Sequence, residues 1–248
     1  MKKYIFVLAA FLPLILLSCD FVEDEMGGGK YWEPSFSGKY TTQTTGTVTY
    51  YEGYNNTSVA YYTPELTSGW YKCAVSENKI NEFPPQSAVE ITYGSKTIKV
   101  LVTDLCPNST NSHWTSKSNY FFDLGKNAFE TLENTSKGYI DVTLKLIPYE
   151  TSQNIKFEVK VGSNQWWLSG RFYNQKNPLK KVEVSYDGKN YTQMRHLDGY
   201  RNNWWVIDGS NLMSNVTFRL TDINNKTVTT NKIGSLSENG KYDTGVNF

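Results

Sequence analysis

The sequence predicts an all-β protein with one or two short helices, and three features of the chain carry this prediction. Beyond residue 30, short segments in which apolar and polar residues alternate dominate the chain. These segments are rich in Val, Thr, Tyr and Trp, and Gly, Asn, Asp and Ser separate them, as is typical of strands and turns. Asp187-Gly188 between two of them indicates a hairpin turn. No long helical period occurs past residue 30.

The alternating segments fall into two groups on either side of a boundary at residues 148–153. The first group includes the one expected helix, over residues 125–134, with Ala128, Phe129 and Leu132 on a single face. The second group contains strands alone and has the size of a β-sandwich. We expect strands over residues 46–51, 89–93, 97–103, 139–147, 155–161, 166–173, 181–186, 203–207, 215–220 and 226–230.

The first 38 residues have the pattern of an export signal and a tether. A basic start precedes an apolar stretch over residues 5–17 that is too short to span a bilayer comfortably. Residues 16–19, Leu-Leu-Ser-Cys, resemble a bacterial lipobox, in which Cys19 is acylated; the alternative is an ordinary signal peptide with an incidental cysteine. Residues 1–19 would then be the signal peptide and residues 20–38 the tether. We expect an exported lipoprotein of the outer membrane or cell surface, held to the membrane by lipid alone.

Cysteine and histidine counts limit the chemistry that the chain can perform. If Cys19 carries lipid, Cys73 and Cys106 remain as an even pair, and in an oxidising compartment they are a candidate disulfide. The two histidines, His113 and His196, form no cluster with the cysteines, so we predict no metal site and no cofactor.

Charge and aromatic content point toward a neutral partner. The net charge is +1, which favours neither nucleic acid nor an anionic membrane as a partner. The 18 Tyr and 7 Trp exceed what a cytosolic enzyme commonly carries. Flat rings of this kind stack on the C–H faces of sugars, although they also form cross-strand pairs in Tyr-rich β-proteins. Composition alone leaves both interpretations open.

Polar residues in the first group of strands form a candidate site. Thr47, Thr49 and Tyr51 alternate along one strand and therefore share a face. Asp104 ends another strand, and Asp123 is expected to open the helix. Taken singly, Asp123 fits a helix N-cap and Asp104 fits a turn former.

Taken together, these segments resemble expansins. The first group carries T-x-T at residues 47–49, TDLCP at 103–107 and FDLxxxAF at 122–129. The second group carries KVGSNQWW at 160–167, NQKNPLKKVE at 174–183, DGK at 187–189, MR at 194–195 and TD at 221–222. The resemblance runs in order from about residue 44 to residue 230. It implies a six-stranded double-psi β-barrel over residues 39–149, followed by an immunoglobulin-like β-sandwich, a carbohydrate-binding module, over residues 152–248.

The resemblance also implies roles for the barrel residues. Asp123 matches the acid that expansins need for wall loosening. Thr47, Thr49 and Asp104 match its companions around a sugar groove, and Tyr51 is assigned to the same groove as a substrate-binding residue.

In the second domain the resemblance implies a planar aromatic strip that binds glucan. Trp166 and Trp167 match its first two rings, and Lys160 flanks it. For the third ring we select Tyr200, with Trp204 as the alternative. Neighbours on a regular strand face opposite sides, so both tryptophans reach one surface only if the backbone turns there; otherwise one is in the core.

The stretch around the second cysteine differs among expansins. Some bacterial members carry a groove tyrosine where this chain has Cys106, and Cys73 matches a cysteine that pairs with it in disulfide-bearing members. Residues 107–120 form a longer insertion than the shortest bacterial members have. Trp114 or Tyr120 within it either adds a sugar contact or packs locally, and we expect local packing.

The residues also bear on whether the protein cleaves glycans. An inverting hydrolase needs an acid and a base. Asp123 fits the acid, but Tyr51 occupies the expected base position and cannot act as a base at neutral pH. Glu52 is expected to point away, which leaves Asp104.

We therefore predict non-hydrolytic binding and loosening of plant cell-wall polysaccharide, cellulose or an associated matrix glycan, by a monomer. One alternative is a weak endoglucanase or peptidoglycan lytic transglycosylase that uses Asp123. The other is a surface lipoprotein that only binds carbohydrate.

Overall fold

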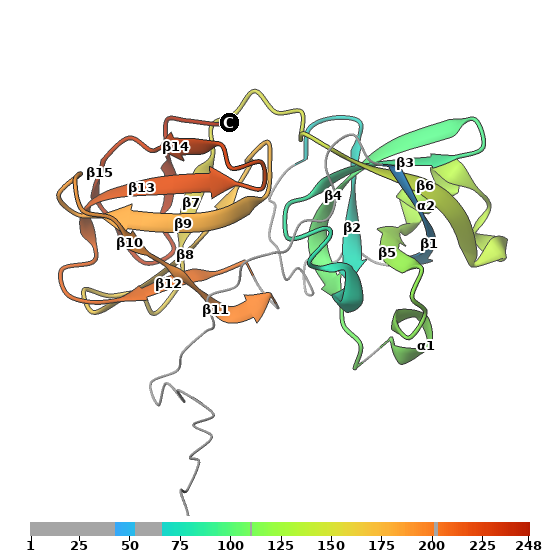
Figure 1. The fold of residues 1–248 in the computed structure, drawn as a ribbon, viewed down its shortest axis with the longest axis horizontal. Coiled ribbons are helices and arrows are strands. Elements are labelled where there is room, and N and C mark those ends of the chain that lie inside the picture. The colour runs from blue at the N-terminus through green and yellow to red at the C-terminus, as the bar shows by residue number, and fades with distance from the viewer. Residues whose placement is uncertain (1–42, 53–65, 110, 201–202) are drawn as a thin grey trace, which may run out of the picture.

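The computed structural model describes residues 43–52, 66–109, 111–200 and 203–248. Figure 1 shows two β-rich units next to each other, one with strands β1–β6 and one with strands β7–β16. The first is a closed six-stranded barrel and the second is built from two sheets, which confirms the predicted fold class of a double-psi β-barrel followed by a β-sandwich. The predicted signal peptide, the tether and Cys19 lie outside the described residues.

The barrel has the strand order β1-β5-β2-β4-β3-β6. The β1–β5 and β2–β4 pairs are parallel, and the other neighbouring pairs are antiparallel. The strands are β1 (Gln43–Tyr51), β2 (Trp70–Ser76), β3 (Ala88–Tyr93), β4 (Lys96–Cys106), β5 (Tyr120–Gly125) and β6 (Tyr139–Ile147). The helical segments are η1 (Glu77–Lys79), α1 (Ser112–Thr115), α2 (Lys126–Leu132) and η2 (Thr135–Lys137).

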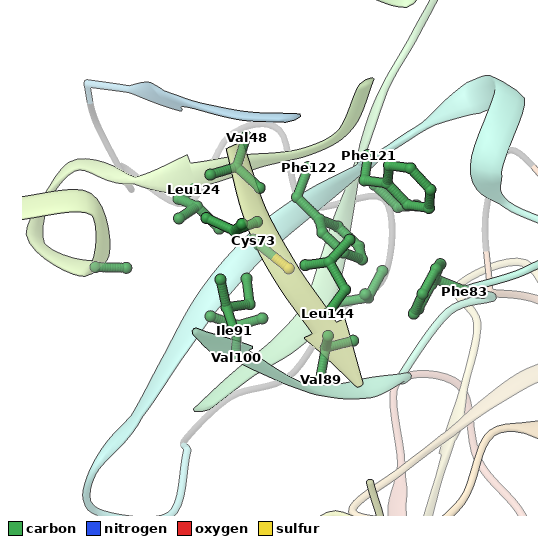
Figure 2. Close-up of a cluster of buried hydrophobic side chains, with 14 of the residues drawn as sticks. Val48, Cys73, Phe83, Val89, Ile91, Val100, Phe121, Phe122, Leu124 and Leu144 are labelled. Atoms are coloured by element: carbon green, nitrogen blue, oxygen red, sulfur yellow. The ribbon is translucent and has the colours of Figure 1, made fainter. Parts of the chain in front are cut away.

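Strand alternation fills the barrel with apolar side chains and directs the polar ones outward. Figure 2 shows Val48, Ile91, Leu124 and Leu144 converging inside the barrel, with the sulfur of Cys73 among them. All five are fully buried. Because each inward residue alternates with an outward one, the neighbours of Val48 and Leu124 along β1 and β5 form the outer face of the barrel.

The predicted helix is present as α2, and its buried residues are Ala128, Phe129 and Leu132, as expected. Asp123 does not open it, however, so that expectation was wrong. β5 continues to Gly125, which pairs with Tyr51 of β1 and is the N-cap of α2. The strand therefore holds Asp123 on the barrel wall, three residues before the helix begins at Lys126.

The second unit is a sandwich of two antiparallel sheets around Phe157, Phe172 and Phe218, whose rings lie 4.4–5.1 Å apart. One sheet has the order β10-β9-β13-β14 with β15 beside β13, and the other has the order β11-β12-β8-β7-β16. The strands are β7 (Lys156–Val159), β8 (Trp167–Tyr173), β9 (Leu179–Ser185), β10 (Thr192–Gln193), β11 (Arg195–Tyr200), β12 (Trp205–Asp208), β13 (Ser214–Asp222), β14 (Thr227–Thr229), β15 (Ile233–Ser235) and β16 (Lys241–Asp243).

Contacts near residues 148–153 join the two units. Tyr149 is buried, and its backbone N–H donates to the carbonyl of Lys176 at 2.7 Å. Ile223 of the sandwich packs against the apolar cluster of the barrel.

Among the described residues, none of the helices has the length and apolar character needed to cross a membrane.

Candidate functional site

One row of side chains crosses five adjacent strands on the outside of the barrel. Strand register places Tyr139 of β6 opposite Thr49, Thr49 opposite Asp123, Asp123 opposite Ala74, and Ala74 opposite Asp104. Residues paired in this way point to the same face of a sheet. We call this row the acid face. It brings together three of the residues that the sequence predicted, Thr49, Asp104 and Asp123.

A chain of hydrogen bonds leads to the carboxylate of Asp123. The hydroxyl of Thr49 donates to Asp123 Oδ1 at 2.8 Å and lies 3.1 Å from the hydroxyl of Tyr120. Because the single proton of Thr49 goes to Asp123, Tyr120 must donate to Thr49. Cys106 Sγ is 3.5 Å from the same tyrosine hydroxyl. Tyr120 and Thr49 are buried, so this network fixes the position of Asp123.

Burial raises the pKa of Asp123 from 3.8 to about 6. The hydrogen bond from Thr49 opposes this rise, and the negative charge of Asp104 adds to it. A carboxyl group with this pKa is partly protonated near neutral pH and can donate as well as accept a proton. The acid face therefore carries a group suited to hydrogen bonding with a glycosidic oxygen or to protonating it.

The remaining predicted residues of the barrel surround this row. Thr47 donates to Asp141 at 2.6 Å and accepts from Asn119 at 2.9 Å. Tyr51 is half-buried and packs against the cluster that includes Tyr120. Glu52 is exposed and pairs with Lys126 at 2.6 Å, away from the acid face, as predicted.

The predicted disulfide between Cys73 and Cys106 is absent, and both thiols are free and buried. Cys73 pairs with Val102 on β4, whereas Cys106 pairs with Ser76 on β2. The two cysteines are thus three residues out of register along β2 and four along β4, which at about 3.3 Å per residue puts their Cα atoms more than about 10 Å apart. A disulfide needs a separation below about 7 Å. An even number of cysteines is a weak guide because it carries no information on register.

Asp104 and Asp123 lie two strands apart with Ala74 between them, so their Cα atoms are about 9–10 Å apart at the usual strand spacing. The criterion for an inverting acid and base concerns the distance between the two carboxyl groups, so this spacing of Cα atoms alone does not decide the role of Asp104. However, Asp104 is only 8% exposed, and its Oδ1 accepts the backbone N–H of Leu105 at 2.8 Å. A base must reach a water molecule, and the burial of Asp104 disfavours this role.

A second polar and aromatic surface covers the outer face of the sheet β11-β12-β8-β7-β16, which we call the platform face. On β8, Trp167 and Arg171 alternate with the buried Leu168 and Phe172, so both point outward. Trp204 is half-buried and lies with its ring 4.4 Å from the guanidinium of Arg171.

Two further contacts place the remaining predicted residues of this surface. The ammonium of Lys160 is 5.7 Å from the Trp204 ring. Trp166 is 61% exposed and lies in the turn before β8, so strand alternation does not force it away from Trp167. This turn is the departure from a regular strand that the sequence required. Tyr200 ends β11, but its side chain lies outside the described residues.

The structure places Trp204 on the platform face, whereas it does not describe the side chain of Tyr200, so the choice of Tyr200 as third ring stays a prediction. Trp205 pairs with Gly170 and is buried, so by alternation Trp204 faces outward beside Arg171. The adjacent tryptophans at 204 and 205 gave a signal for this arrangement.

Within residues 43–52, 66–109, 111–200 and 203–248, no group of three His, Cys, Asp or Glu side chains is placed to hold a metal ion.

The structure thus combines a closed barrel that carries a largely buried acid on its wall with a sandwich that carries an aromatic face. A family model described as lytic transglycolase, of the double-psi β-barrel type, matches residues 45–144. Expansin-YoaJ of Bacillus subtilis is 31% identical over 142 residues, 57% of this chain and 55% of the relative. Expansin-like protein 1 of Dictyostelium discoideum is 32% identical over 116 residues, 46% of this chain and 38% of the relative. The chain thus spans about half or less of these relatives' own lengths.

Solved structures show the same two-domain fold. The expansin of Clavibacter michiganensis superposes with a TM-score of 0.67 at 19% identity, over 83% of this chain and 98% of that one. A substituted form of that expansin, solved in complex with cellohexaose, superposes equally well. By sequence and by fold, the chain is similar to expansins.

Proposed function

We propose that this protein binds plant cell-wall polysaccharide, cellulose or an associated matrix glycan, through the platform face and loosens it at the acid face without cleaving it. The proposal rests mainly on the protonation and the surroundings of one residue, Asp123. It is a carboxyl group with a raised pKa, held by Thr49, on a barrel face whose only other carboxylate in the same row is buried. Such a site can exchange hydrogen bonds with a glycan chain, but it lacks an accessible base.

The platform face supports the binding half of the proposal. Trp166, Trp167 and Trp204 present rings that the sandwich core does not bury, next to the cation of Lys160. Rings of this kind stack on the C–H faces of sugars and tolerate a flat, repetitive surface. A protein of similar fold, the substituted expansin of Clavibacter michiganensis, was solved in complex with cellohexaose, and this supports a glucan as the ligand.

Glycan cleavage is the second candidate, and the raised pKa of Asp123 favours it, because such a group can protonate a leaving oxygen. The family description, lytic transglycolase, also belongs to this candidate. A lytic transglycosylase needs one acid and base rather than a water-activating pair, so Asp123 alone would suffice. The substrate would then be peptidoglycan.

We also propose that the protein is an exported lipoprotein anchored through Cys19, with contact to the membrane through lipid only. The support is the lipobox-like sequence at residues 16–19 after a short apolar stretch. Acyl chains on one cysteine and a tether over residues 20–38 would hold the two domains near the cell surface as a monomer.

The binding proposal is tested by sedimenting the full-length protein with microcrystalline cellulose, xylan and peptidoglycan. We expect wild type to bind cellulose or xylan, and the Trp166→Ala/Trp167→Ala variant to lose about ten- to a hundredfold in affinity, because two stacking contacts disappear. Tyr191→Ala is the matched control, since this ring lies over Arg219 on the opposite sheet.

Equal binding by wild type and the double variant would mean that these rings do not form the platform. Binding to peptidoglycan alone would favour the cleavage candidate. Failure to bind any of the three polymers would contradict the proposal.

A further inference from the structure

Tyr139 is an exposed aromatic residue on the barrel that the roles above leave unexplained. It starts β6 and is 52% exposed, whereas its neighbour Ile140 is buried in the barrel. Register places Tyr139 directly opposite Thr49, which donates to Asp123. Its ring therefore stands on the acid face, one strand beyond the strand of Thr49.

Trp114 of the insertion lies against the same face. Its ring is 5.4 Å from Tyr139, at an angle of 55°, and 6.0 Å from Tyr120, at 34°. It packs on the outward cluster of Ala74, Cys106 and Tyr120 rather than on the barrel core. The local packing that the sequence predicted is present, but the packing partners are residues of the acid face.

We propose that Trp114 and Tyr139 form a sugar-stacking site, separate from the platform face, for a single chain of neutral pyranose sugars with equatorial hydroxyls. The inference rests on the proposed function, because it assigns the acid face a glycan. The inference also names the end of the acid face that holds the sugar chain, and the two rings that bind it.

The surroundings of the two rings fit a sugar better than an apolar partner. The nearest strand positions carry hydrogen-bonding groups, with Thr47, Asp141 and Asn119 linked to one another beside Thr49. A sugar presents C–H groups on its faces, for the rings, and hydroxyls at its edge, for these polar groups.

The length of the row fits a chain rather than a single sugar. From Tyr139 to Asp123 the row crosses two strand spacings, about 10 Å along the curved wall of the closed barrel. This exceeds the width of a single pyranose ring. A chain stacked on Tyr139 would pass Thr49 and reach Asp123.

The test uses full-length protein with the platform face disabled by Trp166→Ala/Trp167→Ala, titrated calorimetrically with cellohexaose, xylohexaose and chitohexaose. We expect this background to bind at least one of the three. Adding Tyr139→Ala or Trp114→Ala should weaken that binding about three- to tenfold each. Tyr139→Phe keeps the ring and should keep the affinity, and Tyr191→Ala on the opposite sandwich sheet should change nothing.

Unchanged affinity in the Tyr139→Ala variant would overturn the inference, as would a background that binds none of the three oligosaccharides. Tyr139 is exposed, so this variant keeps the test valid even if Trp114→Ala melts at a lower temperature. Failure of the proposed function looks different. It would show as loss of sedimentation with insoluble polysaccharide by wild type, whatever these oligosaccharide titrations give.

Discussion

Replacing Arg171 by alanine is expected to lower the free energy of unfolding by about 3–5 kcal/mol, the usual cost of breaking a buried ion pair. Arg171 Nε donates to Glu158 Oε2 at 3.1 Å, and the two side chains are only 12% and 7% exposed. The variant would leave the carboxylate of Glu158 buried without this cation. Chemical denaturation of wild type and variant measures the loss.

The same substitution should also weaken polysaccharide binding. The Arg171 guanidinium lies 4.4 Å from the centroid of the Trp204 ring, and its removal takes away this cation–π contact. Arg171→Lys keeps the charge but not the planar fork, so it should recover part of the stability and little of the binding.

Arg195→Ala is the matched control on the same sheet. Arg195 is 12% exposed, like Arg171, but its partner Asp208 is 59% exposed and stays hydrated without the arginine, so losing this ion pair should cost no more than about 1 kcal/mol. Two results together would contradict this account. They are equal losses in the free energy of unfolding for Arg171→Ala and Arg195→Ala, and unchanged sedimentation of Arg171→Ala with cellulose.

Asp123→Asn is expected to stabilise the protein at neutral pH by about 1–3 kcal/mol. The folded protein raises the pKa of Asp123 from 3.8 to about 6, mainly through burial, so folding disfavours the charged form. Between these pH values the folded state holds a proton that the unfolded state has released. Stability therefore falls as pH rises from about 4 to 6 and then levels off. Asparagine removes this cost and can still accept the hydrogen bond from Thr49.

Denaturation of wild type and Asp123→Asn at pH 3.5, 5 and 8 checks this prediction. The difference in stability should be close to zero at the lowest pH and largest at the highest. Asp243→Asn is a control of opposite sign, because a hydrogen bond from Lys156 lowers the pKa of Asp243 and its contribution to stability grows as pH rises. A variant at position 123 that is less stable than wild type at pH 8 would contradict the account.

Alternation along the chain predicted much of the fold. The strand that carries Val48 inward and Thr49 outward follows from period-two patterning, and the buried side of α2 follows from the helical period. The strands β2 and β5 were not among the expected segments. The gathering of Thr49, Asp104 and Asp123 on one face came from the resemblance to expansins, and the register of the barrel now accounts for it.

Features that depend on the register between distant strands could not be predicted from the sequence. The disulfide failed because the parallel β2–β4 pairing offsets Cys73 from Cys106. The Trp114–Tyr139 contact joins an insertion to the start of β6, and no pattern along the chain indicates which ring meets which. The outward position of Trp204 likewise required the pairing of β8 with β12.

Loosening without cleavage is the central claim, and one measurement on cellulose paper tests it most directly. Tensile strength and newly released reducing ends are recorded on the same strips, with wild type and with Asp123→Asn. The account predicts that wild type weakens the paper, that Asp123→Asn remains folded but does not weaken it, and that both release no more reducing ends than buffer does. Reducing ends that accumulate with wild type and disappear with Asp123→Asn would contradict the account and identify Asp123 as the acid of a glycan-cleaving enzyme.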